Sequence, residues 1–313
     1  MSPAPDVTVD QAAEALRRHH GHDIGPVGCI GEGSWSRAFG YVTDGRALVA
    51  RFGAHVEDFE KDRRAAAIAG SVLPVPEVLQ IGPALGGHLA ITTRGWGQPL
   101  EQLDGDDWRT ALPSVLGVLD ALRTIEVGEV EGRGHWDAAG RGSDPTWRAH
   151  LRAVADDQRH PRASGWRARL ALEADADRTF SAGLALLDRL ADACPDQPHL
   201  VHGDLLNANV LVRDGRVDTV LDWGCAMWGD WLYDLATLTF WSAWHAGLGE
   251  VDVRIAAIDH LGATGVAVPD LDARLLACEL HIGLAAMGYS TLLVPEALPR
   301  IERQVAARLD VGA

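Results

Sequence analysis

The stretch LVHGDLLNANVLVRDGRVDTVLDW, residues 200–223, decides the fold. Apolar and polar residues alternate over 209–213 and again over 216–222, which is the pattern of half-buried strands. Asp214-Gly215 separates the two runs, and this dipeptide favours a two-residue hairpin turn. We therefore expect a strand, then a loop over 202–208, then a hairpin that returns Asp222 to the side of Asn209.

The polar residues of this stretch suit phosphoryl transfer from a nucleotide. Asp204 is the candidate catalytic base, because a carboxylate can orient a hydroxyl and accept its proton. Asn209 and Asp222 are candidate ligands of Mg²⁺, which prefers hard oxygen donors. The metal would bridge phosphate oxygens and neutralise their charge during transfer.

Two other interpretations remain open at this point. His202, Asp204 and Asp222 could form a three-ligand metal site for hydrolysis. Alternatively, Asp204 caps a helix and Asp222 ends a strand, and neither has a chemical role.

Length and charge limit the classes of function. A chain of 313 residues exceeds the usual size of a single core, so two lobes are expected. The formal net charge is -16 and no basic stripe occurs, which argues against nucleic acid as a partner. An acidic protein attracts cationic small molecules, although high charge also serves solubility alone.

Nothing in the sequence indicates a membrane or a secreted protein. No run approaches the roughly 20 apolar residues that span a bilayer. The start, MSPAPDVTVD, lacks the features of a signal peptide, so we expect a cytoplasmic protein. The four cysteines have no CxxC spacing and are expected to be reduced and buried.

The chain changes character near residue 95, which predicts an α+β fold of two lobes, 1–94 and 95–313. Strand patterns at 27–30, 37–42, 47–52, 78–81 and 88–93 surround one helical stretch at 56–69. Beyond Gly95-Trp96-Gly97 the patterns are helical, at 110–125, 167–193, 232–245, 274–287 and 298–309. The Gly-rich and charged stretch 131–143 is expected to be a mobile loop.

Several stretches together resemble the aminoglycoside phosphotransferase family, a branch of the bilobal protein-kinase-like fold, and most of all its hygromycin B type. They span both lobes in order: GEGSWSRAF, FEKDR, LPVPEVLQIG, HGDLLNANVL, LDWGCAMWGD and FWSAW, within residues 31–244. The resemblance implies a small antiparallel-sheet lobe that binds ATP or GTP with Mg²⁺ and a large helical lobe that binds an acceptor.

The resemblance also implies roles for residues of the small lobe. The turn after the first strand would cover the nucleotide phosphates, through Gly31, Gly33, Ser34 and Ser36. Arg51 stands where the family usually has a phosphate-binding lysine, and an arginine fork can keep that role.

The carboxylate partner of Arg51 should come from the next helix. Glu60 is the first choice and Asp62 the second, and periodicity cannot separate them. Lys61 is expected to be a solvated surface residue.

Further roles are implied for the linker and the large lobe. The Thr93 carbonyl and the Gly95 amide would pair with the base, and Asp234 would brace the catalytic loop. Trp241 and Trp244, spaced i and i+3, would stack on the acceptor, although an aromatic pair on a helix also serves as core.

The function expected is an antibiotic O-phosphotransferase that confers resistance by phosphorylating a hydroxyl of an aminoglycoside. Relatives of this type also act on nucleoside or macrolide antibiotics, or on metabolites such as choline, homoserine and fructosamine. A nucleotide-binding pseudokinase without turnover is a third alternative.

Overall fold

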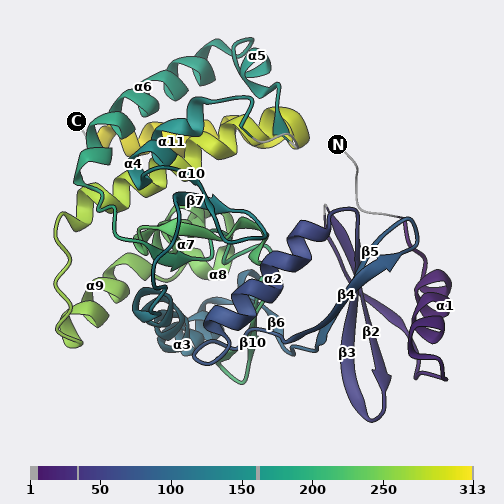
Figure 1. Cartoon of the computed structure of the whole chain (residues 1–313). Helices are drawn as coiled ribbons and strands as arrows, with labels where there is room; N and C mark the ends of the chain where they lie inside the picture. Colours follow the sequence, from purple (N-terminus) through teal and green to yellow (C-terminus); the bar gives the residue numbers. More distant parts are fainter. Residues whose placement is uncertain (1–5, 34, 160–162, 312–313) are drawn as a thin grey trace.

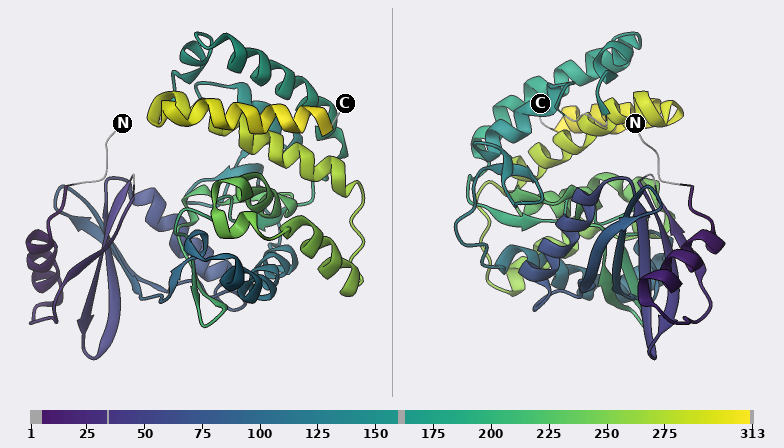
Figure 2. Two further views of the ribbon diagram at one scale, coloured as in Figure 1. Left: turned by 180° about the vertical axis from the view of Figure 1, so that it is seen from behind. Right: turned by 45° about the vertical axis from the view of Figure 1, so that its right-hand side comes forward.

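The computed structural model describes residues 6–33, 35–159 and 163–311 of the chain. It has a small lobe built on an antiparallel sheet and a large, mainly helical lobe (Figure 1). The predicted α+β class is therefore confirmed. Figure 2 shows the two lobes side by side from behind, with α1 on the outer side of the sheet and α2 on the side of the large lobe.

The small lobe holds five antiparallel strands in the order β1-β2-β3-β5-β4. The hairpin of β2 and β3 turns at Asp44-Gly45, where both residues have positive φ (49° and 73°), as a type I′ turn requires. Apolar side chains of α1 pack on the sheet beside Phe39 and Tyr41. The bounds are α1 Val9–His20, β1 Gly28–Glu32, β2 Ser36–Thr43, β3 Arg46–Gly53, α2 Val56–Ala69, β4 Val78–Ala84 and β5 Gly87–Thr93.

Two small sheets lie inside the large lobe. The hairpin expected around Asp214-Gly215 is present as β10 Val210–Arg213 and β11 Arg216–Val220, and β6 Gln98–Pro99 pairs with β10. The second sheet has the order β8-β7-β12-β9. Its strands are β7 Arg133–Trp136, β8 Gly142–Asp144, β9 His199–Val201 and β12 Met227–Gly229.

The prediction of a mobile loop over 131–143 is wrong in part. Residues 133–136 and 142–144 are strands of this second sheet, and Trp136 is 1% exposed. Glycines permit the tight fit, since a Cβ on Gly134 would lie 2.1 Å from His150 Nδ1. Gly134 is therefore required by close packing. A glycine-rich composition is found in closely packed segments as well as in flexible loops, so it cannot tell the two apart.

The helices of the large lobe surround one hydrophobic core. The stretch 167–193, expected as one helix, is broken at 171–173 into α5 and α6. The helices are α3 Gly105–Thr124, α4 Trp147–Arg152, α5 Trp166–Leu170, α6 Ala174–Leu190, α7 Leu232–Trp241, α8 Ala246–Gly249, α9 Val253–Ala263, α10 Leu271–Leu293 and α11 Leu298–Val311.

Helix α10 is long and apolar enough to cross a membrane, but it lies in the core. In its most apolar window, 72% of the residues are buried inside the protein. It packs against α5, α6, α7 and α11, which accounts for apolar residues on all its faces.

Candidate active site

The candidate catalytic loop, which carries Asp204, runs from β9 to β10 over residues 202–209. Gly203 has φ +81°, and a Cβ there would lie 2.6 Å from the Cys225 carbonyl oxygen. Asn207 and Ala208 also have positive φ, 60° and 63°, which is uncommon outside glycine. The loop therefore makes a sharp turn that other parts of the lobe must stabilise.

Asp234 at the start of α7 supplies much of that stabilisation. Its Oδ2 accepts the His202 N–H at 2.8 Å and its Oδ1 accepts the Gly203 N–H at 2.8 Å. Burial raises the pKa of Asp234 to about 7, against the lowering effect of these two hydrogen bonds. The expected bracing of the loop by Asp234 is confirmed.

His202 is buried and uses both ring nitrogens within the protein. Its Nε2 lies 2.8 Å from the Leu221 carbonyl oxygen, and its Nδ1 lies 3.2 Å from the Asp204 amide nitrogen. These partners require a neutral ring that donates from Nε2 and accepts at Nδ1. Burial accordingly lowers the pKa of His202 to about 4. His202 therefore has no nitrogen left for a metal ion, which argues against the hydrolytic three-ligand site.

The carboxylate of Asp204 is held by two carboxamides. Asn207 Nδ2 donates to Oδ1 at 2.8 Å, and Asn209 Nδ2 donates to Oδ2 at 3.0 Å. Burial raises the pKa of Asp204 to about 7; the two amides oppose this shift, while the charges of Asp222 and Glu101 add to it. Asp204 is thus an oriented carboxylate whose affinity for a proton suits transfer near neutral pH.

The two candidate metal ligands lie at the ends of the β10–β11 hairpin. The Leu221 N–H donates to the Asn209 carbonyl oxygen at 2.7 Å, so Asp222 follows directly beside Asn209. Both amide hydrogens of Asn209 are directed at Asp204, since Nδ2 is also 2.8 Å from the Asp204 carbonyl oxygen. This leaves Asn209 Oδ1 available to a cation.

The donor set fits Mg²⁺ better than zinc. Within the described ranges, no group of three or more His, Cys, Asp or Glu side chains could hold a metal ion. One carboxylate and one carboxamide oxygen, as offered by Asp222 and Asn209, suit an ion that keeps water and phosphate oxygens in its shell. The remaining ligands would then come from the substrate and solvent.

The structure pairs Arg51 with Asp62 and corrects the first choice of Glu60. Arg51 Nη1 forms an ion pair with Asp62 Oδ2, and its Nη2 lies 3.4 Å from Asp222 Oδ2. Glu60 is directed away and pairs with Arg63 at 2.8 Å. Residues two apart on a helix point in different directions, so only one of the two carboxylates can face β3.

Asp62 also contacts the backbone beside Asp222. Its Oδ1 accepts the Trp223 N–H at 2.8 Å. Burial raises the pKa of Asp62 to about 6, and Arg51 and the Trp223 amide oppose that shift. Asp62 therefore joins Arg51, the phosphate-binding candidate on β3, to the turn that follows Asp222, the candidate metal ligand.

The expectation that Lys61 is solvated is wrong. Lys61 is 9% exposed, and its Nζ lies 3.1 Å from the Gly224 carbonyl oxygen. The sequence could not show this, because the contact joins positions 163 residues apart.

The turn between β1 and β2 is where the resemblance places the phosphates. The Gly33 N–H donates to the Ser36 carbonyl oxygen at 2.9 Å. A Cβ on Gly31 or Gly33 would meet nothing closer than 3.8 and 3.7 Å, so the protein itself does not require glycine at either position. Ser34 lies outside the described residues. Phosphate binding by Gly31, Gly33 and Ser36 stays a prediction.

The linker after β5 is held closely against the β10–β11 hairpin. A Cβ on Gly95 would lie 2.3 Å from Thr219 Oγ1, and one on Gly97 would lie 2.3 Å from the Val212 carbonyl oxygen. The Trp96 N–H donates to Asp218 Oδ2 at 2.8 Å. Thr93 Oγ1 accepts the Glu77 N–H at 3.0 Å, and base pairing by Thr93 and Gly95 stays a prediction.

The two tryptophans expected at the acceptor site contact each other. Trp241 ends α7 and Trp244 lies in the 3₁₀ turn η6 Ser242–Trp244, with ring centroids 5.3 Å apart in an edge arrangement. The Trp244 indole N–H donates to Gln304, and the Arg300 guanidinium lies 4.1 Å from its ring centroid. One face of Trp244 is thus already occupied, and a role in binding the acceptor stays a prediction for both rings.

Glu101 is a residue of the site that the sequence did not indicate. It lies in the 3₁₀ turn η1 Leu100–Gln102, and its Oε1 accepts the Ala208 N–H of the catalytic loop at 2.5 Å. Its Oε2 is buried and has no hydrogen-bond partner among the described residues. No motif marks it, because its contact with the loop spans 107 residues.

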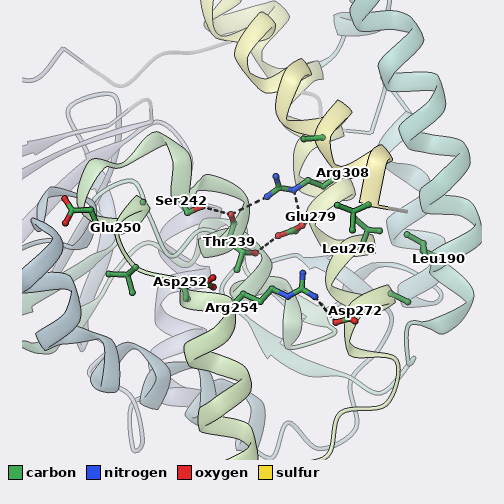
Figure 3. A pocket seen from close by; sticks show the side chains of 16 residues that line it. Leu190, Thr239, Ser242, Glu250, Asp252, Arg254, Asp272, Leu276, Glu279 and Arg308 are labelled. Atoms are coloured by element: carbon green, nitrogen blue, oxygen red, sulfur yellow. Dashed lines mark hydrogen bonds and ion pairs between the residues drawn. The ribbon is translucent and has the colours of Figure 1, made fainter. Parts of the chain in front are cut away.

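A separate cavity of about 790 Å³ opens in the large lobe between α7, α9, α10 and α11. Figure 3 shows two of its arginines, Arg254 and Arg308, each joined to a carboxylate of the lining. Arg254 pairs with Asp272, and Arg308 pairs with Glu279. None of the candidate catalytic, metal or nucleotide residues lines this cavity.

Comparison with known proteins gives consistent matches. Residues 30–267 match the model of the phosphotransferase enzyme family. The chain is 34% identical over 270 residues to Hygromycin-B 4-O-kinase of Escherichia coli, a match that covers 84% of this chain and 74% of that protein.

Solved structures match over nearly the whole chain. A thermostable mutant of aminoglycoside phosphotransferase APH(4)-Ia, solved with AMP-PNP and hygromycin B, has a TM-score of 0.82 at 29% identity, covering 97% of this chain and 99% of that one. A further structure of APH(4)-Ia has a TM-score of 0.84 at 28% identity, covering 98% and 100%. The protein-kinase-like fold expected from the sequence is confirmed.

Proposed function

Because the chain belongs to the phosphotransferase enzyme family, we propose that it transfers the γ-phosphoryl group of a nucleoside triphosphate to a hydroxyl of a hygromycin-like aminoglycoside. The arrangement around Asp204 carries this proposal. Asn207 and Asn209 orient its carboxylate, and Asp222 lies close enough to affect its pKa. The proposed proton acceptor and the two proposed oxygen ligands of the cation are therefore neighbours.

The proposed reaction is a direct transfer. The acceptor hydroxyl oxygen bonds to the γ-phosphorus as the bond from that phosphorus to the β,γ-bridging oxygen breaks. Asp204 orients the hydroxyl and takes its proton. Mg²⁺ held by Asn209 Oδ1 and Asp222 would neutralise charge on the phosphates. Arg51 lies beside Asp222 and would bind phosphate oxygens through the guanidinium N–H groups that its two carboxylate partners leave free.

ATP is the donor that we expect, although GTP remains open. The APH(4)-Ia structures with AMP-PNP and with ADP support an adenine nucleotide. The backbone of residues 93–95 would pair with the base. Because backbone groups make this pairing, the side chains of the linker say little about whether adenine or guanine is preferred.

The acceptor is proposed to be a polycationic aminoglycoside. The relative named for hygromycin B and the APH(4)-Ia complexes with that drug support this class. The formal net charge of -16 favours cationic ligands. Phosphorylation would add a dianion and weaken drug binding at its target, which would confer resistance. The cytoplasm is the proposed location, and the four free cysteines suit its reducing conditions.

An acceptor panel tests the proposal. The purified protein would be incubated with Mg²⁺ and radiolabelled ATP or GTP, with hygromycin B, a macrolide, a nucleoside antibiotic and choline in parallel. We expect label on hygromycin B and not on choline. Turnover of choline alone would refute the antibiotic acceptor, and nucleotide binding without any transfer would identify a pseudokinase.

A further inference from the structure

Lys61 is the single lysine of the sequence, and it is buried between the two lobes. It lies on α2 and reaches the turn after Asp222, where its Nζ is 3.1 Å from the Gly224 carbonyl oxygen. It also forms an ion pair with Glu57, at 4.0 Å. A buried ammonium is costly unless it is hydrogen-bonded, so this contact accounts for its placement.

Lys61 and its neighbour Asp62 hold two consecutive residues of the same turn. Asp62 accepts the Trp223 N–H at 2.8 Å, and Lys61 donates to the Gly224 carbonyl. Helix α2 packs against this turn, η5 Trp223–Cys225. Two adjacent side chains of one helix therefore fix both a donor and an acceptor of one short segment.

The residue that precedes this segment needs such support. Asp222 has φ 54°, in the left-handed region, which is unfavourable for a residue with a Cβ. Its own side chain is about half exposed (48%), and its polar contacts with the described residues are long, 3.4 Å to Arg51 and 3.3 Å to the Gly224 N–H. The direction of its carboxylate therefore depends on the backbone that follows it.

We propose that Lys61 is a positioning residue that holds the turn after Asp222, so that Asp222 faces the cation bound with the nucleotide. This inference rests on the proposed function, because it deepens the role of Asp222 as a ligand. It also makes α2 the element that links the phosphate-binding strand β3 to the metal-binding turn.

Three variants test the proposal: Lys61→Met, Lys61→Arg and, as a control, Arg63→Met on the exposed side of α2. Nucleotide affinity would be measured by calorimetry with Mg²⁺ and with EDTA, together with the melting temperature and kcat. The Mg²⁺-dependent gain is the ratio of nucleotide affinity with Mg²⁺ to that with EDTA, and we expect Lys61→Met to reduce it by about tenfold. We expect kcat to fall by about 10- to 100-fold, since small misplacements in a site have effects of this order. Lys61→Arg should restore most of both, because it keeps a donor, and Arg63→Met should stay within about twofold.

Two outcomes would overturn the proposal. In one, Lys61→Met keeps both kcat and the Mg²⁺-dependent gain within about twofold of the wild type. In the other, its melting temperature falls while the Mg²⁺-dependent gain is unchanged, which would make Lys61 only a stabilising residue. The affinity measurements need no acceptor, so they remain decisive even if the acceptor panel fails.

Chemical modification covers the case in which Lys61→Met does not fold. Because Lys61 is only 9% exposed in the folded protein, the wild type would be acetylated in urea and refolded, and mass spectrometry would distinguish label on Lys61 from label on the amino terminus. Acetylation of Lys61 removes its charge and should reduce the gain from Mg²⁺, whereas reductive methylation keeps the charge and should reduce it less. Complete acetylation of Lys61 with an unchanged gain would refute the proposal.

Discussion

Arg51 contacts two carboxylates with separate arms of its guanidinium, Nη1 with Asp62 and Nη2 with Asp222. A lysine ammonium is a single point charge and would not hold both in fixed directions. Arginine therefore suits position 51, where the resemblance to the aminoglycoside phosphotransferase family leads us to expect lysine. Its two partners lie on different lobes, one on α2 and one after β11.

The correction from Glu60 to Asp62 gives a paired prediction. Asp62→Asn removes the charge that faces Arg51 and should destabilise the fold by roughly 3 kcal/mol, since it leaves a buried cation less well paired. It should also weaken nucleotide binding. Glu60→Gln removes an exposed partner of Arg63 and should change stability by less than about 0.5 kcal/mol. Urea denaturation and nucleotide titration measure both effects, and equal effects of the two variants would contradict the assignment.

His202 provides a prediction about pH. Its pKa is lowered to about 4 in the folded protein from 6.5 in the unfolded chain. Between these values the unfolded state binds more protons, so this contribution to stability is present above pH 6.5 and is lost as the pH falls towards 4. His202→Gln should flatten the fall in unfolding free energy between pH 6.5 and 4 relative to the wild type. If the unfolding free energy depends on pH equally in both proteins, His202 does not stay neutral in the folded protein as we infer.

The sequence predicts Asp204, Asn209 and Asp222 because their placement is local. A loop and a two-residue hairpin set the separation of these residues, and the turn dipeptide Asp214-Gly215 is visible in the sequence. The positions of Lys61 and Glu101 depend on how distant elements pack, and no local pattern records that. The choice between Glu60 and Asp62 likewise depends on the rotation of α2 about its own axis.

At the scale of elements, one face of α11 holds the end of α7. Arg300 and Gln304 donate to the carbonyl oxygens of Ala243 and Phe240, both at 2.5 Å, and Arg308 donates to that of Thr239 at 3.5 Å. The last carbonyl groups of a helix have no partners within the helix, so these donors stabilise it. Helix α11 therefore sets the position of Trp241 and Trp244.

Gln304 offers a test of that arrangement. Gln304→Leu removes the donor to Phe240 and the acceptor of the Trp244 indole N–H. If the tryptophans bind the acceptor, KM for hygromycin B should rise by about 3- to 10-fold, the effect of one or two lost hydrogen bonds, with little change in nucleotide affinity. Arg303→Ala, on the exposed side of α11, is the matched control. An unchanged KM in Gln304→Leu would place the tryptophans in the core only.

The elements that sequence patterns predict well are those with a strong local signal. The strands around Asp44-Gly45 and the helix 56–69 are present as expected. The stretch 131–143 has no strong local strand pattern, because its strands are short and complete a sheet with residues near 200 and 228. The break between α5 and α6 lies at 171–173, where no glycine or proline is present to indicate it.

At the scale of the molecule, α2 belongs to both lobes. The small lobe has its own core beneath α1, yet Ala65 and Ala69 of α2 belong to the core of the large lobe. Both lobes also contribute residues to the candidate site, since Arg51 comes from β3 of the small lobe and Asp222 from the large lobe. The predicted lobe boundary between residues 94 and 95 stays a prediction. Dividing the chain there would separate α2 from the large-lobe core against which it packs.

The central claim is that Asp204 accepts the proton of a hydroxyl while Asn209 and Asp222 hold the metal-bound nucleotide. The most direct test is the rate of hygromycin B phosphorylation by Asp204→Asn at saturating Mg²⁺ and ATP, measured beside the affinity for the nucleotide. We predict that kcat falls by about 10²- to 10⁴-fold while nucleotide affinity stays within about threefold of the wild type. A variant that phosphorylates the drug at nearly the wild-type rate would contradict the account.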